Sequence, residues 1–67
     1  MTNVDLLKNV IETKGIKLCK IGEAIGVSDP TLRRKISGES EFLQSEIVKM
    51  RDFLSLSDDE VRDIFLR

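Results

Sequence analysis

Two adjacent arginines and a lysine, Arg33, Arg34 and Lys35, follow a serine, an aspartate and a proline in the stretch GVSDPTLRRKISG, residues 26–38. An arginine side chain can hydrogen-bond guanine through two parallel bonds in the major groove of DNA. A lysine more often contacts phosphate, which positions a protein on a duplex without reading its sequence. These residue types raise one question: does this stretch bind DNA, or is it an ordinary short helix with a basic outer face?

The composition of the chain restricts the classes of protein to consider. With 67 residues, the chain is long enough for one small domain only. It has no histidine and a single cysteine, so we expect no internal disulfide, no metal site and no cofactor. No nucleophile is paired with a base, so we do not expect an enzyme. No apolar run approaches the roughly 20 residues that cross a membrane, and we expect a cytoplasmic protein.

Charge is distributed unevenly along the chain, although the formal net charge is only −1. Residues 14–40 hold six basic and three acidic side chains, a balance of +3. Residues 41–67 hold four basic and seven acidic side chains, a balance of −3. One half of the chain can therefore face phosphate while the other half faces away. Tyrosine and tryptophan are absent, which disfavours a stacking platform for single strands.

Apolar residues recur with helical spacing, and no run alternates with the period of a strand. This pattern predicts a compact all-α domain of five short helices. The expected helices cover residues 3–14, residues 17–25, a segment from Ser28 to Gly38, residues 43–54, and a segment that opens with a capping box at residues 57–60. The side chains expected to face the core include Leu32, Ile36, Phe42, Leu43, Ile47, Met50, Phe53, Leu54, Val61, Ile64 and Phe65.

The link between the second and third helices is very short. Gly26 is placed to end the second helix, Val27 can fill the corner, and Ser28 starts the third helix, so the two helices must meet at a sharp angle. Gly22, four residues before Gly26, allows the second helix to approach its neighbour closely. This spacing is typical of a helix-turn-helix, here over about residues 17–37.

The segment KGIKLCKIGEAIGVSDPTLRRKISGES resembles the Cro-type, or lambda-repressor-like, helix-turn-helix family of phage regulators and bacterial antitoxins. The later segments EFLQSEIVKM and LSLSDDEVRDIF look like the fourth and fifth helices of small phage members. The resemblance implies one five-helix DNA-binding domain over residues 1–67, acting as a repressor-like transcriptional regulator at the nucleoid of a bacterial or phage-infected cell. The chain differs from many members at Leu18, where they carry a phosphate-binding glutamine, and at Gly22, where they carry alanine.

In a helix-turn-helix, the first residues of the third helix approach the major groove. The expected base contacts are Ser28, Asp29, Pro30, Thr31, Arg33 and Arg34, and the expected phosphate contacts are Lys17, Lys20 and Lys35. We expect Arg33 and Arg34 to make the leading contacts with DNA bases. The residues of the first turn also have structural interpretations, because serine caps a helix, aspartate complements its dipole and proline is tolerated there.

One domain of this size contacts few base pairs, so we expect a homodimer on double-stranded DNA, formed either in solution or only on the operator. The last helix, about residues 58–66, is the expected dimerisation element, through Ile64, Phe65 and Leu66. The alternative function is a protein-interaction module of the same fold that binds and modulates a repressor or a toxin. Leu18, Asp29 and the acidic second half of the chain favour this alternative.

Overall fold

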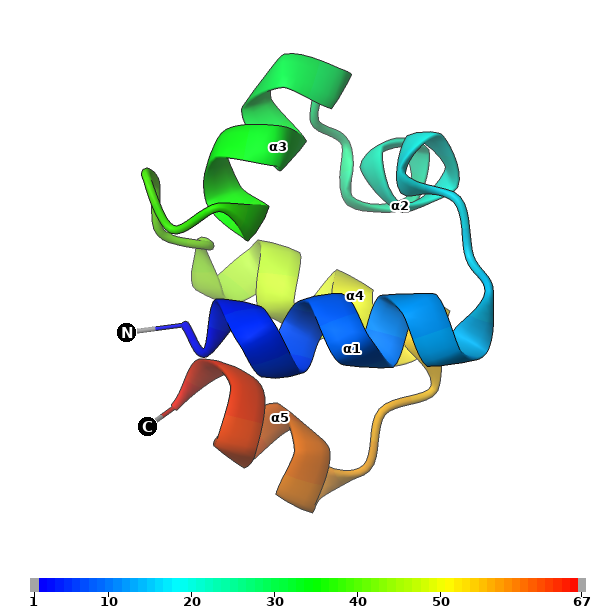
Figure 1. Ribbon diagram of the computed structural model, residues 1–67, viewed down its shortest axis with the longest axis vertical. Coiled ribbons are helices and arrows are strands. Elements are labelled where there is room, and N and C mark those ends of the chain that lie inside the picture. The colour runs from blue at the N-terminus through cyan, green and yellow to red at the C-terminus, as the bar shows by residue number, and fades with distance from the viewer. Residues whose placement is uncertain (1, 67) are drawn as a thin grey trace.

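The computed structural model describes residues 2–66, which form five α-helices and no strand. The helices are α1 (Val4–Lys14), α2 (Leu18–Ile25), α3 (Asp29–Ile36), α4 (Gln44–Leu54) and α5 (Asp58–Phe65). The prediction of a compact all-α domain is therefore confirmed for the described residues. In the view of Figure 1, α2 and α3 lie above α1, α5 lies below it, and α4 lies behind it. None of these helices is long and apolar enough to cross a membrane.

The ends of the helices coincide with capping residues in the sequence. Asn3 accepts a hydrogen bond from an amide in the first turn of α1, at 3.1 Å. Ser57 and Glu60 form the predicted capping box of α5, with hydrogen bonds of 2.9 and 3.1 Å. Gly15 and Gly26 end α1 and α2 in the left-handed conformation, which glycine adopts without the steric cost that a β-carbon brings.

The core is formed where the apolar faces of all five helices meet. The largest fully buried side chains come one from each helix and are Leu7, Ile21, Leu32, Met50 and Ile64. Removing each such side chain from water stabilises the fold by roughly 1.5–3 kcal/mol. Helix α3 contacts α2 and α1, and α2 also contacts α4. The inner face of α3 is thereby held against the body of the protein.

Two apolar residues that were predicted to face the core are exposed instead. Leu43 is 61% exposed because it is the N-cap residue of α4 and precedes the helical turns. Phe53 is 41% exposed because its neighbour Leu54 occupies the core, and adjacent helical residues point about 100° apart. Phe42 and Phe65, in contrast, are buried as predicted, and their rings pack edge to face with centroids 5.4 Å apart.

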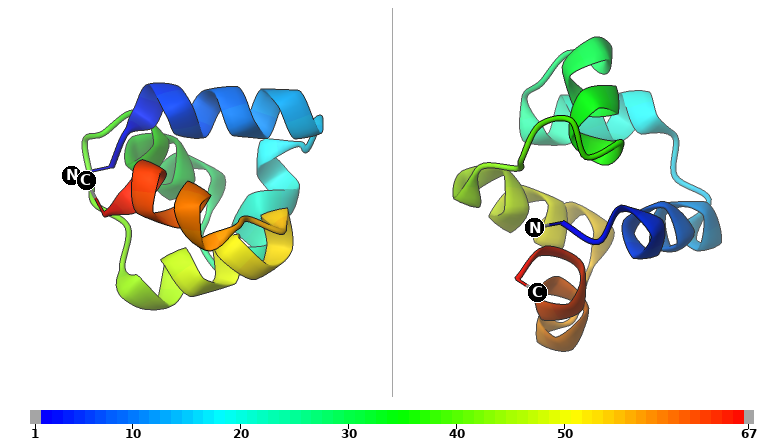
Figure 2. Two further views of the ribbon diagram at one scale, coloured as in Figure 1. Left: turned by 90° about the horizontal axis from the view of Figure 1, so that it is seen from below. Right: turned by 60° about the vertical axis from the view of Figure 1, so that its left-hand side comes forward.

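Helix α5 packs its apolar stripe into the core. Ile64 and Phe65 are enclosed by the rest of the chain, so the prediction that they contact a second copy is wrong. The backbone amide of Asn3 donates a hydrogen bond to the carbonyl of Ile64 at 2.6 Å. Both views of Figure 2 accordingly show the start of α1 beside the end of α5. Leu66, the third predicted dimer contact, is exposed.

Candidate nucleic-acid interface

A turn of three residues, Gly26 to Ser28, joins α2 to α3 and changes the direction of the chain sharply. Gly26 has a φ of +82°, and the amides of Gly26 and Val27 both donate to the carbonyl of Gly22, at 2.8 and 3.0 Å. Val27 is half-buried against the core and fills the corner. The two helices consequently cross steeply, as the right-hand view of Figure 2 shows.

Helix α2 approaches this turn closely at position 22, so a side chain there requires the turn to shift slightly. A β-carbon built on Gly22 would lie 3.0 Å from the carbonyl oxygen of Val27. It would also lie 3.6 Å from Oδ1 of Asp29 and 3.7 Å from Cδ2 of Leu32. The close approach predicted from the sequence is therefore present, and it fixes the start of α3 against the middle of α2.

The residues at the start of α3 are arranged as a capped helix end on the surface. The hydroxyl of Ser28 accepts the amide hydrogen of Thr31 at 3.4 Å and donates to Oγ1 of Thr31 at 3.0 Å. Ser28 is therefore a cap, and its own hydroxyl proton is directed at Thr31. Asp29 and Pro30 are exposed in the first turn, and Thr31 is half-buried. The Thr31 hydroxyl, which accepts here, keeps its proton for donation to a ligand.

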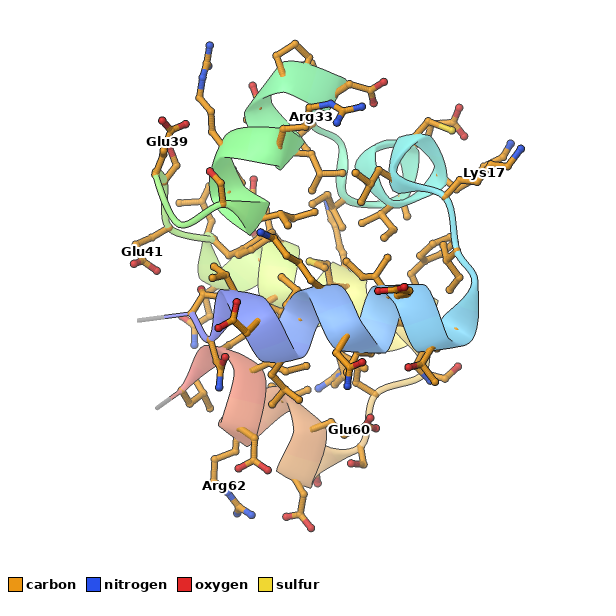
Figure 3. All side chains as sticks on the ribbon, in the orientation of Figure 1. Lys17, Arg33, Glu39, Glu41, Glu60 and Arg62 are labelled. Carbon is orange, nitrogen blue, oxygen red and sulfur yellow. The ribbon has the colours of Figure 1, made fainter. Side chains whose placement is uncertain are left out.

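The outer face of α3 presents two guanidinium groups to solvent. Arg33 and Arg34 are exposed, whereas Leu32 and Ile36 on the inner face are buried. Within residues 2–66, neither arginine is engaged in an ion pair. Figure 3 shows the Arg33 side chain on the side of α3 that faces α2. Both guanidinium groups are therefore available for a ligand on the exposed side of this helix.

Two of the predicted phosphate contacts lie on the surface at the beginning of α2. Lys17 is the N-cap residue of α2 and is exposed, and Figure 3 shows its side chain projecting away from the protein. Lys20 lies 3.9 Å from Glu23, but the two side chains are 63% and 72% exposed. An exposed ion pair at this distance is weak, so it leaves the ammonium group able to bind another anion.

The third predicted phosphate contact, Lys35, is buried, and that prediction is wrong. Its Nζ lies 2.9 Å from Oε1 of Glu46 and donates to the carbonyl of Glu41 at 3.0 Å. Its ammonium group also lies 5.8 Å from the centroid of the Phe42 ring. The sequence contained a signal for this position, because Lys35 follows the buried Leu32 by three residues and shares its helix face.

Glu46, which was not identified from the sequence, binds Lys35 and also caps α4. Its side chain accepts the amide hydrogen of Leu43 at 2.8 Å. Burial raises the pKa of Glu46. Hydrogen bonds from Lys35 and Leu43, together with the charges of Lys35 and Lys49, lower the pKa by more than burial raises it. The net pKa lies below the ordinary value of 4.5. The carboxylate is therefore ionised at neutral pH and holds a permanent charge beside Lys35.

Several acidic side chains lie away from Lys17 or from Arg33. Figure 3 shows Glu39 and Glu41 on the opposite side of the protein from Lys17. Glu60 and Arg62 lie near α5, at the other end of the view from Arg33. The α2–α3 end therefore offers four exposed basic groups, Lys17, Lys20, Arg33 and Arg34, beside two exposed carboxylates, Glu23 and Asp29.

A hollow of about 230 Å³ lies elsewhere, between α1 and the start of α5. It is lined by Asn9, Val10, Thr13, Lys14 and Glu60 and contains none of the predicted site residues. Its volume is below the roughly 300–1,000 Å³ typical of pockets that enclose small ligands. Among residues 2–66, no cluster of histidine, cysteine or acidic side chains is placed to hold a metal ion. The exposed face of α3 is therefore the stronger candidate site.

Comparison with known proteins gives no match: no family model, no curated protein and no solved structure matches the chain. The site is therefore defined by its own geometry. That geometry consists of a helix fixed at its inner face, two exposed guanidinium groups on its outer face, and two exposed ammonium groups on the adjoining helix.

Proposed function

We propose that the chain is a sequence-specific transcriptional regulator that binds double-stranded DNA and inserts α3 into the major groove. The observation that carries this proposal is the exposure of Arg33 and Arg34 on a helix whose opposite face is anchored by Leu32 and Ile36. A helix with its side chains is about 10–12 Å across, and the major groove of B-DNA is about 12 Å wide. In this proposal, α2 and α3 form a helix-turn-helix of the lambda-repressor-like type, and the protein is a Cro-like repressor in the cytoplasm.

The proposed roles differ among the residues of the site. Arg33 and Arg34 contact guanine O6 and N7, and the Thr31 hydroxyl or methyl group contacts a neighbouring base. Asp29 and Pro30 lie beside them in the first turn and come close to base edges, where aspartate accepts a hydrogen bond from cytosine N4. The exposed ammonium groups of α2 contact phosphate. Ser28 caps the helix, and Lys35 does not reach the DNA.

Electrostatics supports binding through one end of the protein only. The net charge is −1, so the chain as a whole has no general attraction for a polyanion. Binding must then depend on the local basic groups of Lys17, Lys20, Arg33 and Arg34. Each phosphate that these groups neutralise releases counterions, so affinity falls steeply as salt is added.

The proposal includes two copies of the chain on adjacent half-sites. A single α3 of eight residues reaches only a few base pairs. Two copies whose α3 helices lie about 34 Å apart on one face of the duplex double the length of sequence that is read. Sedimentation velocity with a duplex of two half-sites tests this, because it separates one bound copy from two.

The test of the proposed function is selection of bound sequences from a pool of random duplexes, followed by fluorescence anisotropy with the enriched sequence. The proposal expects one enriched motif and binding that weakens as salt rises. Arg33→Ala and Arg34→Ala must each weaken binding, whereas Arg62→Ala, an exposed arginine on α5, serves as the matched control. Failure to enrich any sequence, together with capture of a repressor or a toxin, would instead support a protein-interaction module.

A further inference from the structure

A buried ion pair links the last turn of α3 to the first turn of α4. The side chains of Lys35 and Glu46 are each only 10% exposed, and their charged atoms lie 2.9 Å apart. Lys35 lies directly between Arg34 and Ile36 on α3, so its position is coupled to the guanidinium groups of the outer face. The pair is therefore built into the base of the helix that carries the proposed DNA contacts.

The bonds of this pair extend to the loop before α4 and to its helix cap. Lys35 also donates to the carbonyl of Glu41, and Glu46 also accepts the amide hydrogen of Leu43. Phe42, between these two backbone groups, lies beneath the ammonium group and packs against α5 through Phe65. Four directional contacts therefore converge on the segment that joins α3 to α4.

Stability alone does not account for two charges in this position. Burial strips hydration from both groups, and apolar side chains of similar volume are often equally stabilising. Apolar contacts, however, have no direction and permit a helix to slide or rotate by small amounts. Hydrogen bonds from one ammonium group to a carboxylate and to a backbone carbonyl fix both the distance and the direction of the attachment.

We propose that Lys35 is a positioning residue for DNA binding: through Glu46 and the Glu41 carbonyl, it sets the direction in which α3 presents Arg33 and Arg34. The expected effect of Lys35 on DNA binding rests on the proposed function. Its expected effect on the orientation of α3 rests on the structure alone. Lys35 touches no base or phosphate and acts only through the helix that it anchors.

The variant Lys35→Met/Glu46→Gln removes both charges and keeps similar volumes. The glutamine introduced by Glu46→Gln retains a carbonyl oxygen for the Leu43 amide, so the cap of α4 survives. Lys35→Arg is the conservative rescue, because a guanidinium group can still donate to both oxygens. If the double variant does not fold, Lys35→Met alone removes the bonds from Lys35 to Glu46 and to the Glu41 carbonyl and leaves the bond from the Leu43 amide to Glu46 that caps α4.

The direct readout is the orientation of α3, measured by residual dipolar couplings of backbone amides and referred to α1 and α5. The inference expects the α3 couplings to change in the double variant and to keep their wild-type values in Lys35→Arg. Affinity for the selected duplex should fall by about tenfold, within the range of one base contact, while affinity for unrelated duplexes stays within about twofold. This split arises because Lys17 and Lys20 still bind phosphate.

Unchanged α3 couplings in the charge-free variant would overturn the inference, whatever happens to DNA binding. The inference would also be overturned if the wild-type protein binds DNA and the double variant, despite a changed α3 orientation, binds the selected duplex with the same affinity. If the wild-type protein enriches no duplex, the proposed function fails, and the couplings still decide whether Lys35 sets the direction of α3. The two failures are thus separately observable.

Discussion

The backbones of Gly22 and Val27 approach each other closely at the α2–α3 turn. A β-carbon on Gly22 would lie 3.0 Å from the Val27 carbonyl oxygen. This contact is between the middle of one helix and the backbone of the turn, so an added β-carbon requires the turn that leads into α3 to shift by a few tenths of an ångström. The relationship makes Gly22 the position at which a single added group most directly disturbs the geometry of the proposed site.

Substitution of Gly22 should therefore destabilise the protein in proportion to side-chain size. Alanine gains about 1 kcal/mol of helix propensity, which offsets much of the cost of overpacking. Valine lacks most of that gain and adds methyl groups beside Asp29 and Leu32, so Gly22→Val should lose about 2–3 kcal/mol of unfolding free energy. Urea unfolding measures this, with Cys19→Val on the exposed face of α2 as the control. Equal effects at the two positions would contradict the close approach.

The cap of α3 can be separated from its proposed contact with DNA at Ser28. Ser28→Ala removes the hydroxyl that accepts the Thr31 amide and should cost about 1 kcal/mol of unfolding free energy. Ser28→Asp retains a capping oxygen and should preserve stability. The added carboxylate, however, lies at the end of α3 that approaches phosphate and should weaken duplex binding. Thermal unfolding and anisotropy on the same samples test the two effects, and equal duplex affinity for Ser28→Asp would place this end of α3 away from the DNA.

The basic residues of α2 and α3 should differ in how they affect binding. Lys17→Ala should weaken all duplexes alike and reduce the slope of log affinity against log salt by about 1. Arg33→Ala should cost about 1–3 kcal/mol on the selected sequence and relax the preference at one base pair. Arg62→Ala on α5 should change neither quantity. Anisotropy titrations at several salt concentrations distinguish these patterns. A loss of sequence preference in Lys17→Ala would contradict the assignment of Lys17 to phosphate.

Acid should destabilise the protein in part through Glu46. Because the pKa of Glu46 in the folded state is below 4.5, its ionised form stabilises the fold above pH 4.5. This contribution is lost as the pH falls through the folded-state pKa. Glu60 acts in the same direction, because the Ser57 amide lowers its pKa. Urea unfolding between about pH 5 and pH 3 should give a flatter decline for Glu46→Gln than for the wild type. An equally steep decline would remove Glu46 from the acid response.

The helices were predictable because the residues that end them act locally. Gly15, Gly26 and Ser57 each cap a helix through contacts within a few residues of themselves, and a local pattern reveals them. The exposed arginines were predictable for the same reason, since Leu32 and Ile36 fix which side of α3 faces inward.

Apart from Leu43, which is exposed because it precedes the turns of α4, the errors concern residues whose environment depends on other helices. Lys35 was assigned to phosphate because its charge suggested the surface, but its partner Glu46 lies on α4, eleven residues further along the chain. Phe53 and Leu54 are adjacent and both apolar, and only the position of α4 against its neighbours decides which of them is buried. Ile64 and Phe65 were assigned to a dimer because the extent of the core around α5 was not apparent from its own sequence.

The central claim, that the exposed face of α3 binds duplex DNA, is tested most directly by a nuclear magnetic resonance titration. Uniformly ¹⁵N-labelled protein is titrated with the selected duplex at low salt, and the change in each backbone amide shift is mapped along the chain. The proposed function predicts that the largest changes fall on the amides of residues 28, 29 and 31–34 and on those of Lys17 and Lys20, with α5 unaffected. Shifts confined to α5 or to the hollow beside α1, or no shifts at all, would contradict it.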